Sequence, residues 1–151
     1  MLWPSHLSVL WPFLLYRQLW WNHECGEEIF IIDQDDNYLK YANGVVYDSK
    51  TGLEWIAGPG RNMSWDEAKE WAEGLEIDGS GWRMPTRREL ETLYQEGKGK
   101  RNMTRLLETA AWWAWYAEHD DSLSSSLFDF SRGTRDWRSR TPRAYAVRAR
   151  K

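Results

Sequence analysis

The residue types best suited to ligand chemistry lie in the C-terminal half of the chain, where aromatic residues and arginines occur together. Indole and phenol rings offer flat faces for stacking on sugars or bases, and guanidinium groups bind sulfate, phosphate or carboxylate through paired hydrogen bonds. The competing interpretation is that alternate tryptophans of residues 112–115 are buried in the core and that the arginines keep a strand edge soluble. The candidate ligand-binding residues are Trp112, Trp113, Trp115, Tyr116, Arg135, Trp137, Arg138, Arg140 and Arg143.

Residues that could perform catalysis or hold a metal ion are sparse. The single cysteine, Cys25, excludes an internal disulfide and a cysteine-based zinc cluster, and His23 beside it is too little to indicate a catalytic dyad. The segment His119-Asp120-Asp121 offers one imidazole and two carboxylates, fewer ligands than a metal site needs, so we expect a solvated turn there. The sequence therefore predicts a chain that is not an enzyme and uses no cofactor or metal.

Charge is distributed unevenly along the chain, although the formal net charge is only -3. Residues 132–151 carry eight arginines and lysines and one acid, a local charge of +7, and residues 1–131 carry 12 basic and 22 acidic residues, a charge of -10. A basic segment on an acidic body attracts polyanions such as sulfated glycans, nucleic acid or anionic lipid headgroups. The basic segment is explained equally well, without any binding partner, by solvated arginines that protect a strand edge.

Composition indicates one globular domain with an unusual aromatic content. The 151 residues are 42% hydrophobic and 28% charged, which excludes a wholly disordered chain and fits a single core. Twelve tryptophans must either build that core or furnish a binding surface. No run approaches the roughly 18 apolar residues that cross a membrane.

Residues 1–26 form an apolar, tryptophan-rich segment ahead of a single domain over residues 27–151. Leu7–Tyr16 has the length of a signal-peptide core, but no lysine or arginine precedes it and no Ala-x-Ala-like cleavage site follows. Aromatic rings beside Arg17 suit a membrane interface, so membrane contact through residues 3–21 is a second interpretation. A mis-assigned start without a role is the third, and the sequence does not separate the three.

The elements that must position the candidate residues are predicted from periodicity and turn signals. Residues 27–32 are predicted as a buried strand, followed by a polar turn over residues 33–37. Asn43-Gly44 is a hairpin signal, and alternation predicts a strand over Leu53–Ile56. Further strands are expected over residues 112–116, 127–130 and 144–150.

Two capping boxes predict where helices begin. Ser64 with Glu67 opens the first helix, and Thr86 with Glu89 opens the second, because each pair satisfies backbone N–H groups of a first helical turn. Apolar residues then recur at helical spacing in both segments. A brief third helical turn is expected over residues 106–111.

Several of these pieces, in this order, resemble the Lcl C-terminal domain family, a domain of unknown function named after the C-terminal domain of a bacterial collagen-like adhesin. Asn43–Trp55 resembles the family's Asn-Gly-x-Val-x-Asp-x-x-Thr-Gly-Leu-x-Trp opening, with one offset in spacing, and Trp65–Ala68 its Trp-x-x-Ala helix. Gly79–Leu90 contains Trp-Arg-Met-Pro-Thr-x-x-Glu-Leu, close to the family's hallmark. Tyr145–Arg150 occupies the place of the closing strand, and the resemblance covers about residues 38–150.

The resemblance implies an α+β, C-type-lectin-like fold in which two helices flank a small, mostly antiparallel sheet whose N- and C-terminal strands lie close. Independently of the resemblance, we expect Arg83 to pair with a carboxylate or with backbone carbonyls. The helix and strand spacing of the tryptophans predicts core residues rather than ligand platforms at Trp55, Trp65, Trp71 and Trp82. The calcium-dependent sugar-binding signatures of lectin-like folds are absent from the sequence. The structural signature residues are Trp55, Trp65, Trp82, Arg83, Pro85, Thr86 and Glu89.

We therefore expect a non-enzymatic, adhesion-type binding module of the bacterial envelope or exterior, whose partner is a polyanionic glycan or a protein surface. A protein-recognition module resembling the variable receptors is the alternative, because residues 112–126 are rich in aromatic residues and serines. Nucleic-acid binding through the basic C-terminal segment is the weaker alternative. A cytoplasmic location stays open, because no clear signal peptide or disulfide pair is present.

Overall fold

The computed structural model describes residues 30–118, 126–136 and 141–151, and these form an α+β fold. Within them lie two helices and two antiparallel sheets, so the predicted α+β class is confirmed, with two sheets where one was expected. In chain order the elements are β1 (Ile31–Asp35), β2 (Tyr38–Tyr41), β3 (Val46–Asp48), β4 (Leu53–Ala57), α1 (Trp65–Glu73), α2 (Arg87–Leu93), β5 (Trp113–Trp115), β6 (Leu127–Asp129), β7 (Thr134–Asp136) and β8 (Tyr145–Ala149).

The larger sheet has the strand order β1-β2-β3-β4-β8, and each neighbouring pair is antiparallel. β8 returns from the far end of the sequence and pairs with all five residues of β4, from Leu53 opposite Ala149 to Ala57 opposite Tyr145. β1 and β8 form the two edges of this sheet, so the first and last strands are not neighbours. The outer edge of β8 is partly covered, because Arg83 and Val147 exchange two backbone hydrogen bonds of 3.1 and 2.9 Å.

β1 shares Ile31 and Ile32 with the predicted strand over residues 27–32, of which residues 27–29 lie outside the described part of the chain. The predicted turn over residues 33–37 is shorter than expected and is confined to Asp36 and Asn37. Asp33 and Asp35 belong to the strand, and only two residues, beginning at Asp36, separate it from β2. The carboxylates are tolerated in a strand because they have partners on a distant loop. Asp33 forms two hydrogen bonds of 2.6 Å with Arg105, and Asp35 accepts one of 2.6 Å from Thr104.

Both predicted helices begin at their capping boxes. The Ser64 hydroxyl accepts from the Glu67 amide, and the Thr86 hydroxyl from the Glu89 amide, while each glutamate accepts from the backbone amide of its cap. The third helical turn expected over residues 106–111 is not formed. Instead, the Leu107 amide bonds to Thr104 three residues earlier, giving a turn that buries Leu106 and Leu107.

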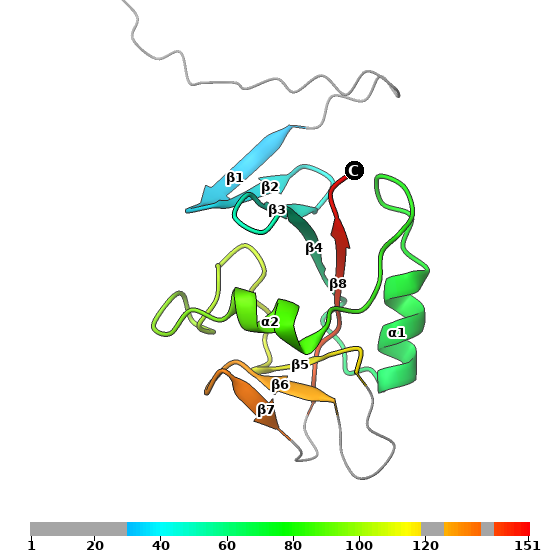
Figure 1. Ribbon diagram of the computed structural model, residues 1–151, viewed down its shortest axis with the longest axis vertical. Helices are drawn as coiled ribbons and strands as arrows, with labels where there is room; N and C mark the ends of the chain where they lie inside the picture. The colour runs from blue at the N-terminus through cyan, green and yellow to red at the C-terminus, as the bar shows by residue number, and fades with distance from the viewer. Residues whose placement is uncertain (1–29, 119–125, 137–140) are drawn as a thin grey trace, which may run out of the picture.

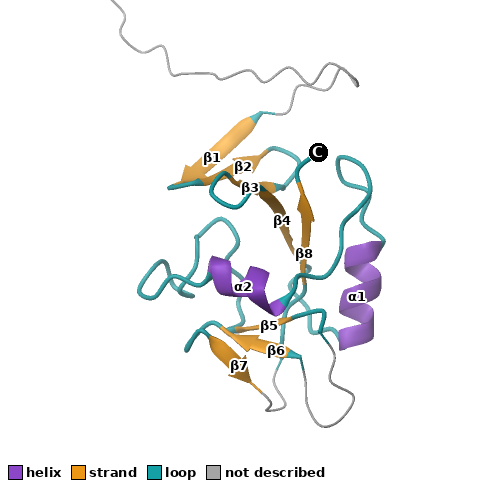
Figure 2. Cartoon of the chain, viewed as in Figure 1, coloured by secondary structure: helices purple, strands orange, loops and turns teal. Residues whose placement is uncertain are grey.

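The two helices cover opposite faces of the larger sheet, as Figure 2 shows on either side of β8. Ala146 of β8 packs in one cluster with Ala72 of α1, and the adjacent Val147 packs in another with Leu90 and Leu93 of α2. Successive side chains of a strand point to opposite faces, so this alternation places α1 and α2 on the two sides. No helix among the described residues is long and apolar enough to cross a membrane.

The smaller sheet has the order β5-β6-β7 and lies at the end of the molecule away from β1 (Figure 1). Arg143 adds a parallel bridge to the free side of β5, because its amide donates to Trp113 and its carbonyl accepts from Trp115, at 2.9 and 3.1 Å. Ala114 at the centre of β5 and Phe128 opposite it are fully buried. This sheet therefore carries Trp113, Trp115, Arg135 and Arg143 on one compact support.

Candidate functional site

The acidic and basic residues of the β6–β7 hairpin differ in their exposure to solvent. Asp129 and Asp136 are buried, at 4% and 8% exposure, whereas Arg132 and Arg135 are exposed. The Asp129 carboxylate turns back to the hairpin, where it accepts from the Ser131 amide and hydroxyl at 2.7 and 2.6 Å. The hairpin therefore exposes its two arginines and buries its two acids, although the segment 126–136 contains as many acids as arginines.

The aromatic residues of β5 and its flanks are divided between core and surface. Tyr116 is buried, and Trp112, Trp113 and Trp115 are half-buried. The Trp115 indole N–H donates to the Met63 carbonyl at 2.8 Å, and the Arg101 guanidinium lies 4.6 Å from the centre of the Trp112 ring. The tryptophans thus have structural contacts on one side and partly exposed rings on the other.

Arg143 is half-buried beside β5, and its guanidinium donates to the Asn62 side chain at 2.6 Å. The loop before α1 is therefore tied to β5 twice, through Asn62 to Arg143 and through the Met63 carbonyl to Trp115. Trp137, Arg138 and Arg140 of the candidate set lie outside the described residues. The same is true of Cys25, residues 1–26 and the segment 119–121.

The basic C-terminal run does not form one patch. β8 carries Arg148 and the chain end away from the β6–β7 hairpin, toward the opposite end of the molecule (Figure 1). Arg148 is buried rather than solvated along a strand edge, so that interpretation is wrong for this residue. The local charge of the sequence run therefore overstates the charge available at either end.

Arg148 instead joins β8 to the loop before Trp82. Its Nε donates to the Glu54 carboxylate at 2.7 Å, and both side chains are at most 7% exposed. Its Nη1 donates to the carbonyls of Asp78 and Gly79 at 2.9 and 3.2 Å, and its guanidinium lies 4.3 Å from the centre of the Trp82 ring. This is a fold-holding cluster, because every group in it is satisfied by another part of the chain.

The signature residues of the resemblance also hold the fold. Trp55 and Trp82 are buried, as predicted for core tryptophans, whereas Trp65 and Trp71 are half-buried. The Trp65 indole donates to the Tyr116 carbonyl at 2.9 Å and the Trp82 indole to the Ile77 carbonyl at 2.9 Å.

Arg83 pairs with a carboxylate, as predicted. Its two terminal nitrogens donate to Glu89 at 2.9 and 2.6 Å, and Glu89 also accepts from the Thr86 amide at 2.8 Å. Burial raises the pKa of Glu89, but the hydrogen bonds from Arg83 and Thr86 outweigh it, so the pKa lies below its usual range. Pro85 completes the signature, because its carbonyl accepts from the Ala117 amide at 2.8 Å.

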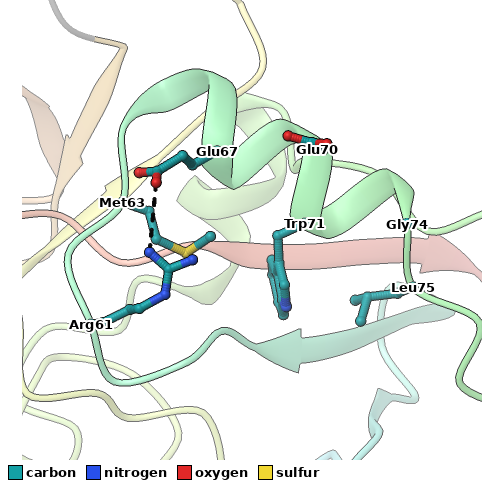
Figure 3. Close-up of a pocket in the computed structure, with 7 residues that line it drawn as sticks. All are labelled: Arg61, Met63, Glu67, Glu70, Trp71, Gly74 and Leu75. Atoms are coloured by element: carbon teal, nitrogen blue, oxygen red, sulfur yellow. Dashed lines mark ion pairs between the residues drawn. The ribbon is translucent and has the colours of Figure 1, made fainter.

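A groove beside α1 is the feature that the sequence did not predict. It has a volume of about 430 Å³ and lies between the loop before α1 and the face of the helix (Figure 3). Its apolar part is provided by Met63, Trp71 and Leu75, and its polar rim by Arg61, Glu67 and Glu70, with Gly74 at the far end. The sequence predicted Trp71 as a core residue from its helical spacing, whereas in the structure it is half-buried and lines the groove. Within the described residues no group of three or more His, Cys, Asp or Glu side chains is placed to hold a metal ion.

Comparison with known proteins identifies the family. Residues 44–150 match the model of the Lcl C-terminal domain, so the chain belongs to that family and the predicted resemblance is confirmed. The matched part begins just before β3 and ends just after β8. No match was found among curated proteins or among solved structures.

Proposed function

We propose that this member of the Lcl C-terminal domain family is a non-enzymatic, adhesion-type binding module that acts at the bacterial envelope or outside the cell. Its ligand is a polyanionic glycan. We call its binding surface the arginine surface: it comprises Arg132 and Arg135 of the β6–β7 hairpin, Arg143 beside β5, and the half-buried Trp112, Trp113 and Trp115. We also propose that the fold is C-type-lectin-like. The antiparallel pairing of β4 with β8 supports this, because it brings strands from near the two ends of the family domain, residues 44–150, side by side.

One observation carries the proposal: the hairpin buries its two acids and exposes its two arginines. A guanidinium held on a short hairpin loses less freedom on binding a sulfate than one on a flexible tail. Arg132 lies in the turn, which the Gly133 amide closes by donating to the Asp129 carbonyl at 2.8 Å, and Arg135 lies on β7, directly after that turn. Two exposed arginines on a hairpin whose two acids are buried favour an anionic partner.

The test is binding of the full chain to a size-defined heparin oligosaccharide. Changing Arg132 and Arg135 to serine together should weaken binding about tenfold or more at physiological salt, because two charge-assisted contacts are lost. The matched control changes Lys50 and Lys151 to serine, which removes the same charge from two other exposed positions. The control variant should keep most of the affinity.

Three results would contradict the proposal. The first is absence of heparin binding by the folded chain. The second is equal weakening by both double variants, which would indicate general charge rather than a site. The third is equally tight binding of a DNA oligonucleotide with a steep dependence on salt, which would favour the nucleic-acid alternative.

A further inference from the structure

We infer that the groove beside α1 is a second binding site, separate from the arginine surface, and that it takes an uncharged hydroxylated ring such as one hexose unit of a neutral glycan. The groove is lined by one indole ring, one guanidinium group and two carboxylates. Its volume of about 430 Å³ is at the lower end of the range for small-molecule sites. None of these residues belongs to the arginine surface described above.

Trp71 provides a fixed stacking face. Its ring is half-buried and packs against two core clusters, one containing Ala72 and one containing Ala68, so it cannot reorient freely. Figure 3 shows the ring projecting from the helix between Met63 and Leu75, and Trp71 is one of the residues that line the groove. A rigid indole bordered by apolar side chains suits the C–H face of a sugar ring, which is apolar while its edges are polar.

The opposite wall of the groove is also held in place. Met63 is buried, its carbonyl accepts from Trp115, and the neighbouring Asn62 accepts from Arg143. Glu67 is held by the capping box, because its Oε2 accepts from the Ser64 amide at 2.7 Å. A groove whose walls are fixed before binding loses little conformational freedom when a ligand enters.

The polar rim offers both donors and acceptors to hydroxyl groups. Arg61 Nη1 lies 3.8 Å from Glu67 Oε1, which is too long for a direct hydrogen bond, so both groups keep capacity for a hydroxyl placed between them. Glu70 adds an exposed carboxylate on the next part of the helix. The amide hydrogen bond from Ser64 lowers the pKa of Glu67, which keeps this acceptor ionised at neutral pH.

Charge selects against the other ligand classes. Two carboxylates and one guanidinium leave the rim with a net charge of -1, which repels sulfated or phosphorylated ligands. The guanidinium of Arg61 in turn opposes a lysine or arginine side chain from a basic peptide. An uncharged ring with several hydroxyl groups is repelled by neither the carboxylates nor the guanidinium. Its hydroxyls can donate hydrogen bonds to the carboxylates and accept them from Arg61.

The test uses the full chain labelled with nitrogen-15 and neutral tetrasaccharides of glucose, galactose and mannose. At least one of them should produce a saturable shift of the Trp71 indole signal, with a dissociation constant of about 1 mM, typical of a single small contact surface. Arg61→Gln and Glu70→Gln should each weaken this binding about fivefold, because each replaces a charge-assisted hydrogen bond to the sugar with a weaker neutral one. Glu73→Gln is the matched control, because Glu73 is exposed on the same helix but does not line the groove.

The inference is overturned if none of the three sugars shifts the Trp71 signal of the folded chain. It is also overturned if Glu73→Gln weakens binding as much as Glu70→Gln, or if the groove instead takes a tetralysine peptide. Heparin binding should be unchanged in Glu70→Gln, and sugar binding unchanged after loss of Arg132 and Arg135. Failure of this site is therefore distinguishable from failure of the arginine surface.

Discussion

Replacing Arg148 with methionine tests whether its buried cluster holds the fold. The substitution keeps an unbranched apolar chain but removes the 2.7 Å ion pair with Glu54, the bonds to the carbonyls of Asp78 and Gly79 and the stacking on Trp82. It leaves the Glu54 carboxylate only 7% exposed, with the half-exposed Arg150, 4.0 Å from Glu54 Oε1, as a longer ion-pair partner.

The expected loss follows from the cost of isolating a buried charge. Removing one partner of a buried ion pair costs about 3–5 kcal/mol, whereas replacing both partners with apolar residues is often close to neutral. We therefore expect Arg148→Met to lower the free energy of unfolding by about 4 kcal/mol, a large part of the roughly 5–15 kcal/mol that stabilises a domain. The double variant Glu54→Met with Arg148→Met should recover more than half of that loss.

The assay is urea unfolding followed by tryptophan fluorescence and circular dichroism. With a slope of about 2 kcal/mol per molar urea, the single variant should move the midpoint by about 2 M. Arg87→Met is the control, because it breaks an exposed ion pair of 2.9 Å with Glu91 and should cost less than about 0.5 kcal/mol. A loss below about 1 kcal/mol for Arg148→Met would refute the reasoning, as would a double variant less stable than the single one.

Three further predictions concern helix starts, acid and turns. Ser64→Ala should lower the free energy of unfolding by about 1 kcal/mol in urea unfolding, because it removes the cap of α1. The pKa of Glu89 is lowered in the folded state, so ionised Glu89 stabilises the fold at pH values above its unfolded pKa. This stabilisation is lost as the pH falls through the folded-state pKa. The drop in the urea midpoint between pH 6 and pH 3 should therefore be smaller for Glu89→Gln than for the unchanged protein. Gly133→Ala should cost more in thermal unfolding than Gly52→Ala: both have positive φ, at 69° and 74°, but only at Gly133 would the added carbon meet a side chain, Tyr94, at 2.6 Å. Equal losses for the two glycine variants would show that the Tyr94 contact does not matter.

The parts of the fold that follow local rules could be predicted from the sequence. Each capping box is contained within four residues, so Ser64 and Thr86 marked the starts of α1 and α2 correctly. The alternation in β4 and β8 likewise depends only on neighbouring residues, and both strands form where it predicted them. Local signals therefore identified the helices and the pair of strands that closes the family domain.

The errors arose where partners lie far apart in the sequence. Asp33 and Asp35 look like turn residues when viewed locally, but they bond to Arg105 and Thr104, about seventy positions away. The segment around Leu107 looks helical by composition, but the Arg101 side chain bonds to the carbonyls of Thr109 and Ala110 and holds the chain in a different shape. Neither arrangement has a signal within a short window of sequence.

The candidate site shows the same limit. The residue types of the arginine surface could be predicted from the sequence, but the division of the basic C-terminal run could not. β8 carries Arg148 away from the hairpin that holds Arg135, and the buried Glu54 neutralises the charge of Arg148. The groove beside α1 could not be found, because it exists only where Met63 and Arg61 are brought against the helix. Its formation depends on hydrogen bonds to Trp115 and Arg143, which are more than fifty positions away.

The number of tryptophans, which left a core and a binding surface as alternatives, is therefore a poor guide to function until each indole is placed. Trp82 is buried with its N–H bonded to a carbonyl, and Trp65 and Trp115 are half-buried with theirs bonded in the same way, so their polar atoms already serve the fold. A ligand that stacked on Trp65 or Trp115 would have to accept the orientation that these bonds impose. Trp71 differs because its ring joins two core clusters and also lines a groove. Placement beside a cavity and a mixed polar rim, rather than abundance, is what favours Trp71 as a recognition residue.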